Sequence, residues 1–435
     1  MEIQTNCKCG KQHIFTSEVI VKEGALQEIP RLLKQYGAKK VFLLADQNTD
    51  QAAGQAVTSI VEAEQVKIVK CIFPEAALEP DEHCVGRAMM YYESDCDMVI
   101  GVGSGVINDI GKIVANVSAK PYIIVGTAPS MDGYASATSS MTRDGLKISL
   151  PSKCADVIIG DLDVLCQAPT KLMASGLGDM LAKYVSICEW RIANLITGEY
   201  YCEDIAQLVR QALKKCADNA QGLLQRDKKA VKAVFEGLVI GGVAMAYAGV
   251  SRPASGVEHY FSHIWDMRGV EFGTPVELHG IQCAMATHHA VKLYEILKAY
   301  LPNYEKAAAY VSAFNQQAWE QTLSQFLGKG AQAMIEQEKK DGKYSKETHG
   351  ARFEIIAKNW DTIVQIMEEE LPSSQEIAKL LKTIGISTDL ATIGVDTQCA
   401  RITFQATKDI RDKYVLSRLA WDLGVLDEMA AQIGC

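Results

Sequence analysis

Residues 97–112, DMVIGVGSGVINDIGK, decide the fold class of this chain. The run that ends at Gly103 is short, apolar and rich in β-branched residues, as in strands that are buried on both faces. Two further small residues, Ser104 and Gly105, follow it, and the helical spacing of apolar residues begins near Asn108. A strand, a glycine-rich turn and a helix in this order are typical of an α/β domain with a parallel sheet.

Four more segments of the same kind precede residue 168 and alternate with segments of helical periodicity. They are VFLLA (41–45), VKIVKCIF (66–73), PYIIVGT (121–127) and ADVIIGD (155–161). Strands that alternate with helices form parallel sheets that are covered by helices. We therefore expect residues 1–168 to form an α/β domain with a parallel sheet.

The character of the sequence changes after residue 168. Apolar residues recur at three- and four-residue spacing, and β-branched runs become scarce. Pro169 and Thr170 could begin a helix, and we expect the polar stretch 336–350 to be an exposed loop or a helix end. We predict an all-α second domain over residues 169–435, with a ligand-binding cleft beside the carboxyl ends of the parallel strands.

The composition excludes several classes of protein. The 435 residues are 48% hydrophobic and 22% charged, which is too apolar for a disordered chain. The net charge of −9 argues against nucleic acid or an anionic membrane surface as the main partner. No window approaches the ~20 apolar residues of a membrane span, and the N-terminus lacks a secretory pattern. The 13 cysteines are odd in number and several lie singly in apolar runs, which favours a reducing, cytoplasmic location.

Five of the eight histidines lie between residues 259 and 289: His259, His263, His279, His288 and His289. The first two are four residues apart, so both project from one face of a helix, and the third follows a Pro-marked turn. Neutral imidazoles from two neighbouring segments suit a divalent metal, and one carboxylate would complete a three-ligand site that is open to substrate. Surface or capping histidines are the alternative, and we interpret the last two in that way.

Asp179, in ASGLGDMLAKY (174–184), is a candidate for that carboxylate. It follows two close glycines and opens an otherwise apolar helical stretch. The alternative is a carboxylate that interacts only with the helix dipole.

Polar side chains also follow three of the predicted strands. After residue 103, backbone N–H groups and a helix N-terminus could hold a pyrophosphate, but Val106 stands where G-x-G-x-x-G has its third glycine. Asp46 could accept hydrogen bonds from ribose hydroxyls. The segment GTAPSMDGYAS follows another strand with the polar side chains of Thr127, Ser130, Asp132 and Ser136. Turns made only for packing or solvation are the alternative at each position.

The N-terminal segment CKCGKQH offers Cys7, Cys9 and His13 as a possible metal clasp. No second pair at zinc spacing accompanies it, so we favour an ordinary exposed start of the chain.

Five segments together resemble the sn-glycerol-1-phosphate dehydrogenase family in their order and approximate spacing. They are GVGSGVINDIGK, TAPSMDGYAS, GLGDMLAK, SGVEHYFSH and ELHG, and the likeness runs from about residue 18 to the C-terminal RLAWDLGVLDEMA. That family belongs to a metal-dependent group that also holds glycerol dehydrogenase and, more distantly, dehydroquinate synthase. The resemblance implies a Rossmann-like dinucleotide-binding domain over residues 1–168 and an all-helical metal- and substrate-binding domain over residues 169–435. It also implies reversible conversion of dihydroxyacetone phosphate to glycerol 1-phosphate with NADH or NADPH.

The resemblance also implies roles for individual residues. The metal ligands would be Asp179, His259 and His279, with the metal polarising the C2 carbonyl before hydride transfer. His263 would face the substrate and deliver the proton, and Asp132 would also contact substrate. The dinucleotide would be held by Asp46, Gly103, Ser104, Gly105, Val106, Ile107, Thr127, Ser130 and Ser136.

Lys183 marks a departure from related enzymes, because iron-type alcohol dehydrogenases have a fourth ligand, a histidine, at that position. Three protein ligands favour Zn²⁺ or Ni²⁺ over iron. The group further suggests a homodimer that acts on a small phosphorylated three-carbon substrate. Glycerol dehydrogenase, a sugar-phosphate cyclase and a non-catalytic metal-binding protein remain alternatives. The substrate phosphate needs a cation, and Lys112, Lys153, Lys183 and Arg252 are candidates near the motifs.

Overall fold

The computed structural model describes residues 7, 9–74, 78–143 and 146–434. Contacts between residues divide the chain into two compact units. The first unit holds residues 1–180 and 207–250, and the second unit holds residues 181–206 and 251–435.

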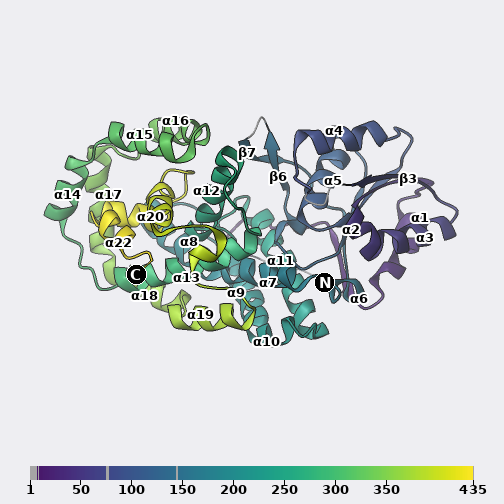
Figure 1. Ribbon diagram of the computed structural model, residues 1–435. Coiled ribbons are helices and arrows are strands. Elements are labelled where there is room, and N and C mark those ends of the chain that lie inside the picture. Colours follow the sequence, from purple (N-terminus) through teal and green to yellow (C-terminus); the bar gives the residue numbers. More distant parts are fainter. Residues whose placement is uncertain (1–6, 8, 75–77, 144–145, 435) are drawn as a thin grey trace. The chain divides into compact units, whose positions relative to one another are not determined.

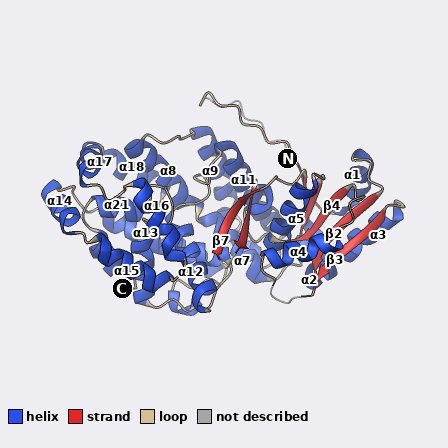
Figure 2. Cartoon of the chain, turned by 90° about the horizontal axis from the view of Figure 1, so that it is seen from above, coloured by secondary structure: helices blue, strands red, loops and turns tan. Residues whose placement is uncertain are grey.

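A six-stranded sheet forms the framework of the first unit (Figures 1 and 2). Its strand order is β1-β8-β5-β4-β2-β3, and every neighbouring pair is parallel. The strands are β1 (Glu18–Lys22), β2 (Lys40–Asp46), β3 (Lys67–Phe73), β4 (Met98–Gly103), β5 (Tyr122–Gly126) and β8 (Val157–Asp161). Every residue of β4, β5 and β8 is buried, because both faces of the sheet are covered. The predicted α/β fold with a parallel sheet is confirmed.

Helices and a small hairpin surround this sheet. The helical elements before β8 are η1 (Ala25–Glu28), α1 (Ile29–Gln35), α2 (Gln47–Thr49), η2 (Asp50–Gly54), α3 (Gln55–Ala63), α4 (Glu82–Tyr91), α5 (Gly105–Ser118) and η3 (Gly133–Ala135). The hairpin pairs β6 (Thr138–Arg143) with β7 (Leu146–Pro151) in antiparallel register. On one face, Leu32 of α1 and Val57 of α3 share a hydrophobic core with Leu43 of β2 and Ile100 of β4.

The first unit extends past the boundary expected between residues 168 and 169. It includes α6 (Leu162–Leu165), most of α7 (Thr170–Leu181), α10 (Ala220–Leu223) and α11 (Lys228–Ala248). A Cβ at Gly126 of β5 or Gly160 of β8 would lie only 2.8 or 2.4 Å from the ring of Phe235. Helix α11 therefore packs directly on these strands, although it is far from them in sequence.

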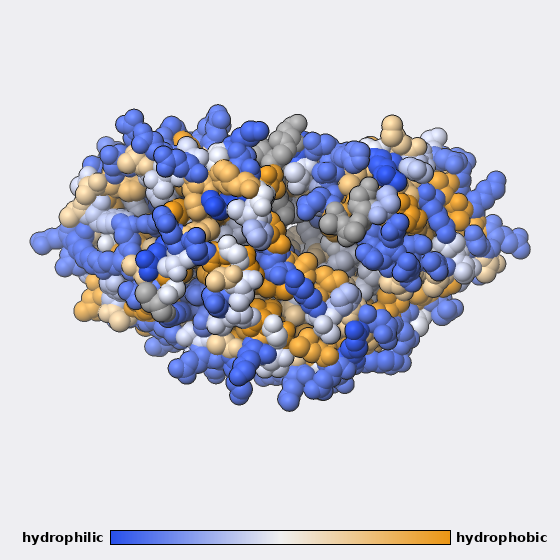
Figure 3. Space-filling view, in the orientation of Figure 1, coloured by the Kyte–Doolittle hydropathy of each residue, from blue (hydrophilic) through white to orange (hydrophobic). Residues whose placement is uncertain are grey.

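Helix α11 is also the one helix among the described residues that is long and apolar enough to cross a membrane. Of its most apolar window, 72% is buried inside the structure, as in the core helix of a compact unit. Figure 3 shows hydrophilic side chains interspersed with smaller hydrophobic areas on the face that it draws.

Helices are the only extended regular elements among the described residues of the second unit. They are α8 (Lys183–Thr197), α12 (Val257–Phe272), α13 (His279–Leu297), α14 (Tyr304–Ala313), α15 (Gln316–Leu327), α16 (Gly330–Asp341), α17 (Lys346–Lys358), α18 (Trp360–Glu370), α19 (Ser374–Thr383), η4 (Leu390–Ile393), α20 (Thr397–Ala406), α21 (Leu416–Asp422) and α22 (Leu426–Ala431). Helix α9 (Glu203–Asp218) crosses the point in the sequence where the units divide. The predicted helical character of the C-terminal part is confirmed.

The stretch 336–350, expected to be a loop or a helix end, is mostly helical. It holds the end of α16, a short turn and the beginning of α17. Gly342 ends α16 with a left-handed φ of 61°, and the Ser345 hydroxyl accepts a hydrogen bond from the Thr348 N–H to begin α17. The C-cap of α16 and the N-cap of α17 therefore both lie within this polar stretch.

Candidate active site

The order of the strands reverses between β2 and β4 in the first unit. The chain passes from β2 to β3 at one edge of the sheet and then to β4 on the other side of β2. Leu44 pairs with Gly101, so Asp46 and Gly103 end their strands at the same edge of the sheet. Ligands of doubly wound sheets bind outside the carboxyl ends of the strands at such a reversal.

The glycine-rich loop after β4 has the geometry of an anion-binding turn. Ser104 precedes the first turn of α5, which holds Gly105, Val106 and Ile107. Among the described residues, the Ser104 side chain makes no capping hydrogen bond to this turn. The backbone N–H groups of the first turn of α5 could therefore donate to an anion at the N-terminus of the helix. A Cβ at Gly103 would lie 2.6 Å from Ile107, so only glycine fits this turn.

The segment after β5 lies against this loop. The Thr127 N–H donates to the Gly103 carbonyl at 3.1 Å, and the Ser104 and Ser130 hydroxyls are hydrogen-bonded to each other. The Ser136 hydroxyl is engaged with Thr138 Oγ1 at 3.0 Å. The structure thus brings Gly103, Ser104, Thr127 and Ser130 together. Ser136 instead stabilises the turn before β6.

Asp46 has a structural role at the end of β2. Its Oδ1 accepts a hydrogen bond from the Thr49 N–H at 2.9 Å, and its own N–H donates to Thr49 Oγ1 at 3.0 Å. This reciprocal capping box fixes the start of α2 and the orientation of the carboxylate.

Asp179 is completely buried on α7 in the first unit. Its Oδ2 accepts a hydrogen bond from the Asp132 N–H at 2.9 Å. The Ser175 hydroxyl of the same helix donates to the Ser130 carbonyl at 3.0 Å. Helix α7 therefore holds the segment after β5 and places the backbone of Asp132 beside the Asp179 carboxylate.

Three of the predicted histidines converge in the second unit. His259 and His263 lie on α12, and His279 is the first residue of α13. The ring centroids of His259 and His279 are 5.1 Å apart, and that of His263 is 6.5 and 6.0 Å from them. One donor atom from each of His259, His279 and Cys283 lies within 4.8 Å of the other two. The other two histidines hydrogen-bond to backbone carbonyls, His288 to that of Ser374 and His289 to that of Thr388.

Hydrogen bonds fix the orientation of two of these rings. His259 Nδ1 lies 2.8 Å from a carboxyl oxygen of Glu258, so this nitrogen carries the proton and donates it. The Ser262 hydroxyl donates to Gln282 Oε1 at 2.6 Å and therefore accepts from His279 Nδ1, 2.9 Å away. In both rings the lone pair is left on Nε2, the arrangement that second-shell partners give to metal ligands.

A buried pair of acids supports this arrangement. Burial, with repulsion from Glu258, raises the pKa of Glu189 to about 8. Glu189 Oε2 accepts from the Val257 N–H at 2.9 Å, and Glu258 Oε1 accepts from the Gly256 N–H at 2.7 Å. The acids thereby hold the first turn of α12, from which His259 projects.

Sequence reasoning missed Glu258, Ser262 and Cys283. The segment SGVEHYFSH contains the first two beside the histidines, which was the available signal. Their pairing was not foreseeable, because Ser262 meets His279 only through the packing of α12 on α13.

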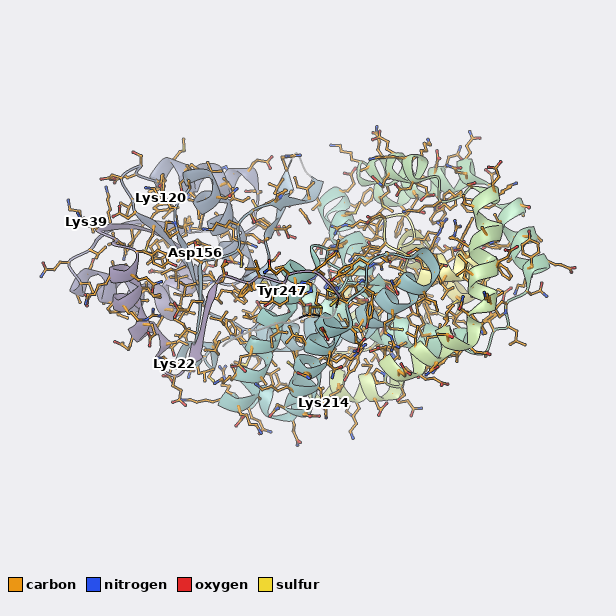
Figure 4. The ribbon with its side chains drawn as sticks, turned by 180° about the vertical axis from the view of Figure 1, so that it is seen from behind. Lys22, Lys39, Lys120, Asp156, Lys214 and Tyr247 are labelled. Carbon is orange, nitrogen blue, oxygen red and sulfur yellow. The ribbon has the colours of Figure 1, made fainter. Side chains whose placement is uncertain are left out.

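The four cations considered for the substrate phosphate have different surroundings. Lys112 is buried and pairs with Asp109 at 2.8 Å, and Lys153 pairs at 2.7 Å with Asp156, which is labelled in Figure 4. Arg252 binds Glu199 and lines a cavity of about 340 Å³ in the second unit together with Lys343, Arg352, Lys413 and Arg418. Lys183 is completely buried in α8.

Comparison with known proteins agrees with this geometry. Residues 20–169 match the model of a family described as iron-containing alcohol dehydrogenase. A glycerol-1-phosphate dehydrogenase [NAD(P)+] of Halalkalibacterium halodurans is 32% identical over 298 residues, 67% of this chain and 75% of the relative. The chain belongs to the glycerol-1-phosphate dehydrogenase family. Members of this family are oxidoreductases, and the predicted recognition of the family is confirmed.

Two further comparisons support this membership. The glycerol-1-phosphate dehydrogenase [NAD(P)+] of Bacillus licheniformis is 32% identical over 67% of this chain and 74% of the relative. The crystal structure of glycerol dehydrogenase from Schizosaccharomyces pombe matches 97% of this chain and 92% of its own, with a TM-score of 0.62 and 18% identity. At 18% identity this likeness shows only that the two proteins share a fold.

Proposed function

We propose that this family member interconverts dihydroxyacetone phosphate and sn-glycerol 1-phosphate with NADH or NADPH, in the cytoplasm. The observation that carries the proposal is the convergence of His259 and His279, whose Nδ1 atoms are hydrogen-bonded to Glu258 and Ser262 and whose rings lie 5.1 Å apart by centroid. The names of the relatives that are similar over two-thirds of the chain support the same activity.

Asp179, His259 and His279 would hold one divalent cation. Two neutral imidazoles and a carboxylate suit Zn²⁺ or Ni²⁺, and Lys183 occupies the position of a fourth ligand in iron-type relatives. The Asp132 N–H holds one oxygen of Asp179, which restricts the rotation of the carboxylate. When bound, such a cation polarises the ketone carbonyl as a Lewis acid, and the nicotinamide cofactor supplies the hydride.

The first unit would bind the dinucleotide at the edge where β2 and β4 end. The first turn of α5 offers N–H groups to the pyrophosphate, and the segment from Thr127 to Ser130 orients the nicotinamide. Asp46 would accept hydrogen bonds from ribose hydroxyls, and the remaining predicted contact is Ser136.

His263 would deliver the proton to the oxygen at C2, and Asp132 would contact the substrate. The His263 ring lies 6.0 Å from the ring of His279 by centroid, beside the proposed metal ligands. From there His263 would give its proton to the substrate oxygen directly or through one water molecule. The protein would act as a homodimer. One of Lys112, Lys153, Lys183 and Arg252 would bind the substrate phosphate.

A substrate comparison tests the proposed activity. NADH consumption should be far faster with dihydroxyacetone phosphate than with dihydroxyacetone, because a buried cationic contact to phosphate is charge-assisted. Equal kcat/KM for the two ketones would favour a glycerol dehydrogenase, and no net NADH consumption with either would contradict both. The assay should follow metal removal and separate restoration of Zn²⁺ and Ni²⁺.

Two histidine variants separate the proposed roles. His259→Ala should lose the bound metal and the activity together, since it removes a ligand. His263→Ala should retain the metal and lose about 10²–10⁴-fold in kcat, the usual contribution of a proton donor. Metal analysis of the dialysed proteins checks both, with His288→Ala as a control that should resemble the wild type. Full metal content in His259→Ala would exclude it as a ligand.

A further inference from the structure

We propose that Cys7, Cys9 and His13 form a second metal site, which binds a thiophilic divalent cation of the Zn²⁺ type. The site lies in the first unit, and its residues precede the part of the chain that matches the family model, residues 20–169. The proposed dehydrogenase activity makes no use of them.

The three side chains gather within bonding reach of a single ion. The sulfur atoms of Cys7 and Cys9 are 2.9 Å apart, and Cys9 Sγ lies 3.2 Å from His13 Nε2. Ligands of a tetrahedral zinc lie roughly 3.5–3.8 Å apart, given Zn–S of ~2.3 Å and Zn–N of ~2.0 Å. An ion can therefore enter after the two sulfur atoms separate by less than about 1 Å.

The histidine of this cluster is oriented as a metal ligand. His13 is only 8% exposed, which corrects the expectation of an ordinary exposed start. Its Nδ1 donates to the carbonyl of Tyr247 at 3.0 Å, and the two rings pack at a centroid distance of 5.3 Å. The Nε2 lone pair is thus left facing the sulfur of Cys9. Tyr247 lies near the end of α11 and is labelled in Figure 4.

The backbone between the cysteines and the histidine also fits a metal-binding turn. The Cys9 N–H points to Cys7 Sγ at 3.3 Å. Gly10 follows with a φ of 76°, a conformation that side-chain-bearing residues rarely adopt. This glycine lies between Cys9 and His13, whose side chains are in contact.

Soft thiolates together with imidazole select Zn²⁺ over Mg²⁺ or Ca²⁺, which prefer oxygen. This chemistry differs from that of the proposed Asp179, His259 and His279 set, so the two sites can be distinguished by spectroscopy.

Metal analysis of the full-length protein tests the proposal. The double variant Cys7→Ser/Cys9→Ser should hold about one Zn²⁺ per chain fewer than the wild type after dialysis. The same loss should appear in a His259→Ala background, where the proposed active-site metal is absent. Cys399→Ser is the matched control and should retain the wild-type content, since Cys399 is a partly buried cysteine of the second unit.

Reconstitution with Co²⁺ gives an independent readout. The wild type should show a thiolate-to-cobalt charge-transfer band that is lost in the double variant but present in Cys399→Ser. Equal metal content and equal spectra in wild type and double variant would overturn the proposal.

Thiol alkylation of the wild type keeps the test decisive if the double variant does not fold. Cys7 and Cys9 should react with iodoacetamide more slowly in Zn²⁺-loaded protein than after treatment with a chelator, as measured by peptide mass spectrometry. Equal rates, or a Cys7–Cys9 disulfide in place of a metal, would contradict the site. Dehydrogenase assays of the double variant separate the two proposals, because loss of this site leaves the proposed Asp179, His259 and His279 ligands in place.

Discussion

Single hydrogen bonds decide what the histidines of the second unit can do. A histidine presents a lone pair at only one ring nitrogen, and the partner of the other nitrogen selects which one. Glu258 makes that choice for His259, and Ser262 makes it for His279. The neighbours of the proposed ligands are therefore as important for metal binding as the ligands themselves.

Glu258→Gln tests this dependence at the level of one charge. The amide oxygen can still accept from His259 Nδ1, but the negative charge that makes the imidazole a better ligand is lost. We expect metal affinity to fall about 10–100-fold, as for other outer-shell substitutions, with a parallel loss of kcat/KM that added metal restores. Competition with a chromophoric chelator measures the affinity.

Glu271→Gln, on the same helix α12, is the control for that substitution. It removes a carboxylate outside the histidine cluster and should leave affinity unchanged. Equal affinities of Glu258→Gln and wild type would remove Glu258 from its orienting role.

Asp46 caps the N-terminus of α2 and is also a proposed contact of the cofactor ribose. Two substitutions distinguish these two roles. Asp46→Asn keeps an acceptor for the Thr49 N–H but removes the charge that would repel a 2′-phosphate. We expect it to lower KM for NADPH relative to NADH with unchanged thermal stability. Asp46→Ala should change the same ratio and also cost about 1 kcal/mol of stability through the lost cap. Steady-state kinetics with both cofactors, and thermal melts, give the comparison.

At the scale of elements, the close approach of α7 to the segment after β5 positions several proposed site groups. A Cβ at Gly176 would lie 1.8 Å from the carbonyl oxygen of Pro129, which is backbone and has little freedom to move. Ser175 and Asp179 on the same helix bind Ser130 and Asp132 in that segment. The helix and the segment therefore form one packed structure.

Gly176→Ala should separate this pair of elements. We expect a loss of about 1–3 kcal/mol in the free energy of unfolding, as for other overpacked cores, together with reduced cofactor affinity. Urea unfolding and NADH fluorescence measure the two effects. Gly350→Ala is the matched helical control, because a Cβ there meets only the Tyr304 hydroxyl at 3.7 Å. It should gain up to about 1 kcal/mol from helix propensity, and equal behaviour of the two variants would contradict the packing argument.

The elements that the sequence predicted well are those with a one-dimensional signal. The five predicted strands all exist, since buried parallel strands are continuous apolar runs. Strand β1 escaped notice because EVIVK lies at the edge of the sheet and is only partly buried. The hairpin of β6 and β7 is polar and short, so it has no such run.

For the whole molecule, a buried acid in the second unit links stability to pH. Glu338 of α16 is 4% exposed, and among the described residues neither of its carboxyl oxygens has a hydrogen-bond partner. Burial, with repulsion from Asp409, raises its pKa to about 7 from the ordinary 4.5. The folded chain therefore keeps this proton between pH 4.5 and 7, while the unfolded chain releases it. Its stabilising contribution is complete below pH 4.5 and is lost as the pH rises through 7.

Glu338→Gln should remove this dependence. The variant should match the wild type near pH 5 and exceed its stability at pH 8, because the neutral amide carries no buried charge at either pH. Urea midpoints across this range give the comparison. Glu336→Gln, an exposed neighbour on α16, should follow the wild type. A constant difference between Glu338→Gln and wild type at all pH values would contradict the assigned pKa.

The sequence by itself determined the class of each part of the chain and the candidates for its chemistry. Apolar runs, helical periodicity and the clustering of histidines are local properties, so the parallel sheet, the helical part and His259 with His279 could be read from them. The boundary predicted at residue 168 rested on composition alone, and the packing of α11 against β5 and β8 could not be read in that way.

Only the tertiary structure decided which side chains meet across large separations in sequence. Ser262 orients His279, and the carbonyl of Tyr247 orients His13 from more than two hundred residues away. Such contacts depend on how helices pack, which no spacing of residues encodes. For that reason the sequence favoured an ordinary chain start for Cys7, Cys9 and His13, and only the folded protein brings their side chains into contact.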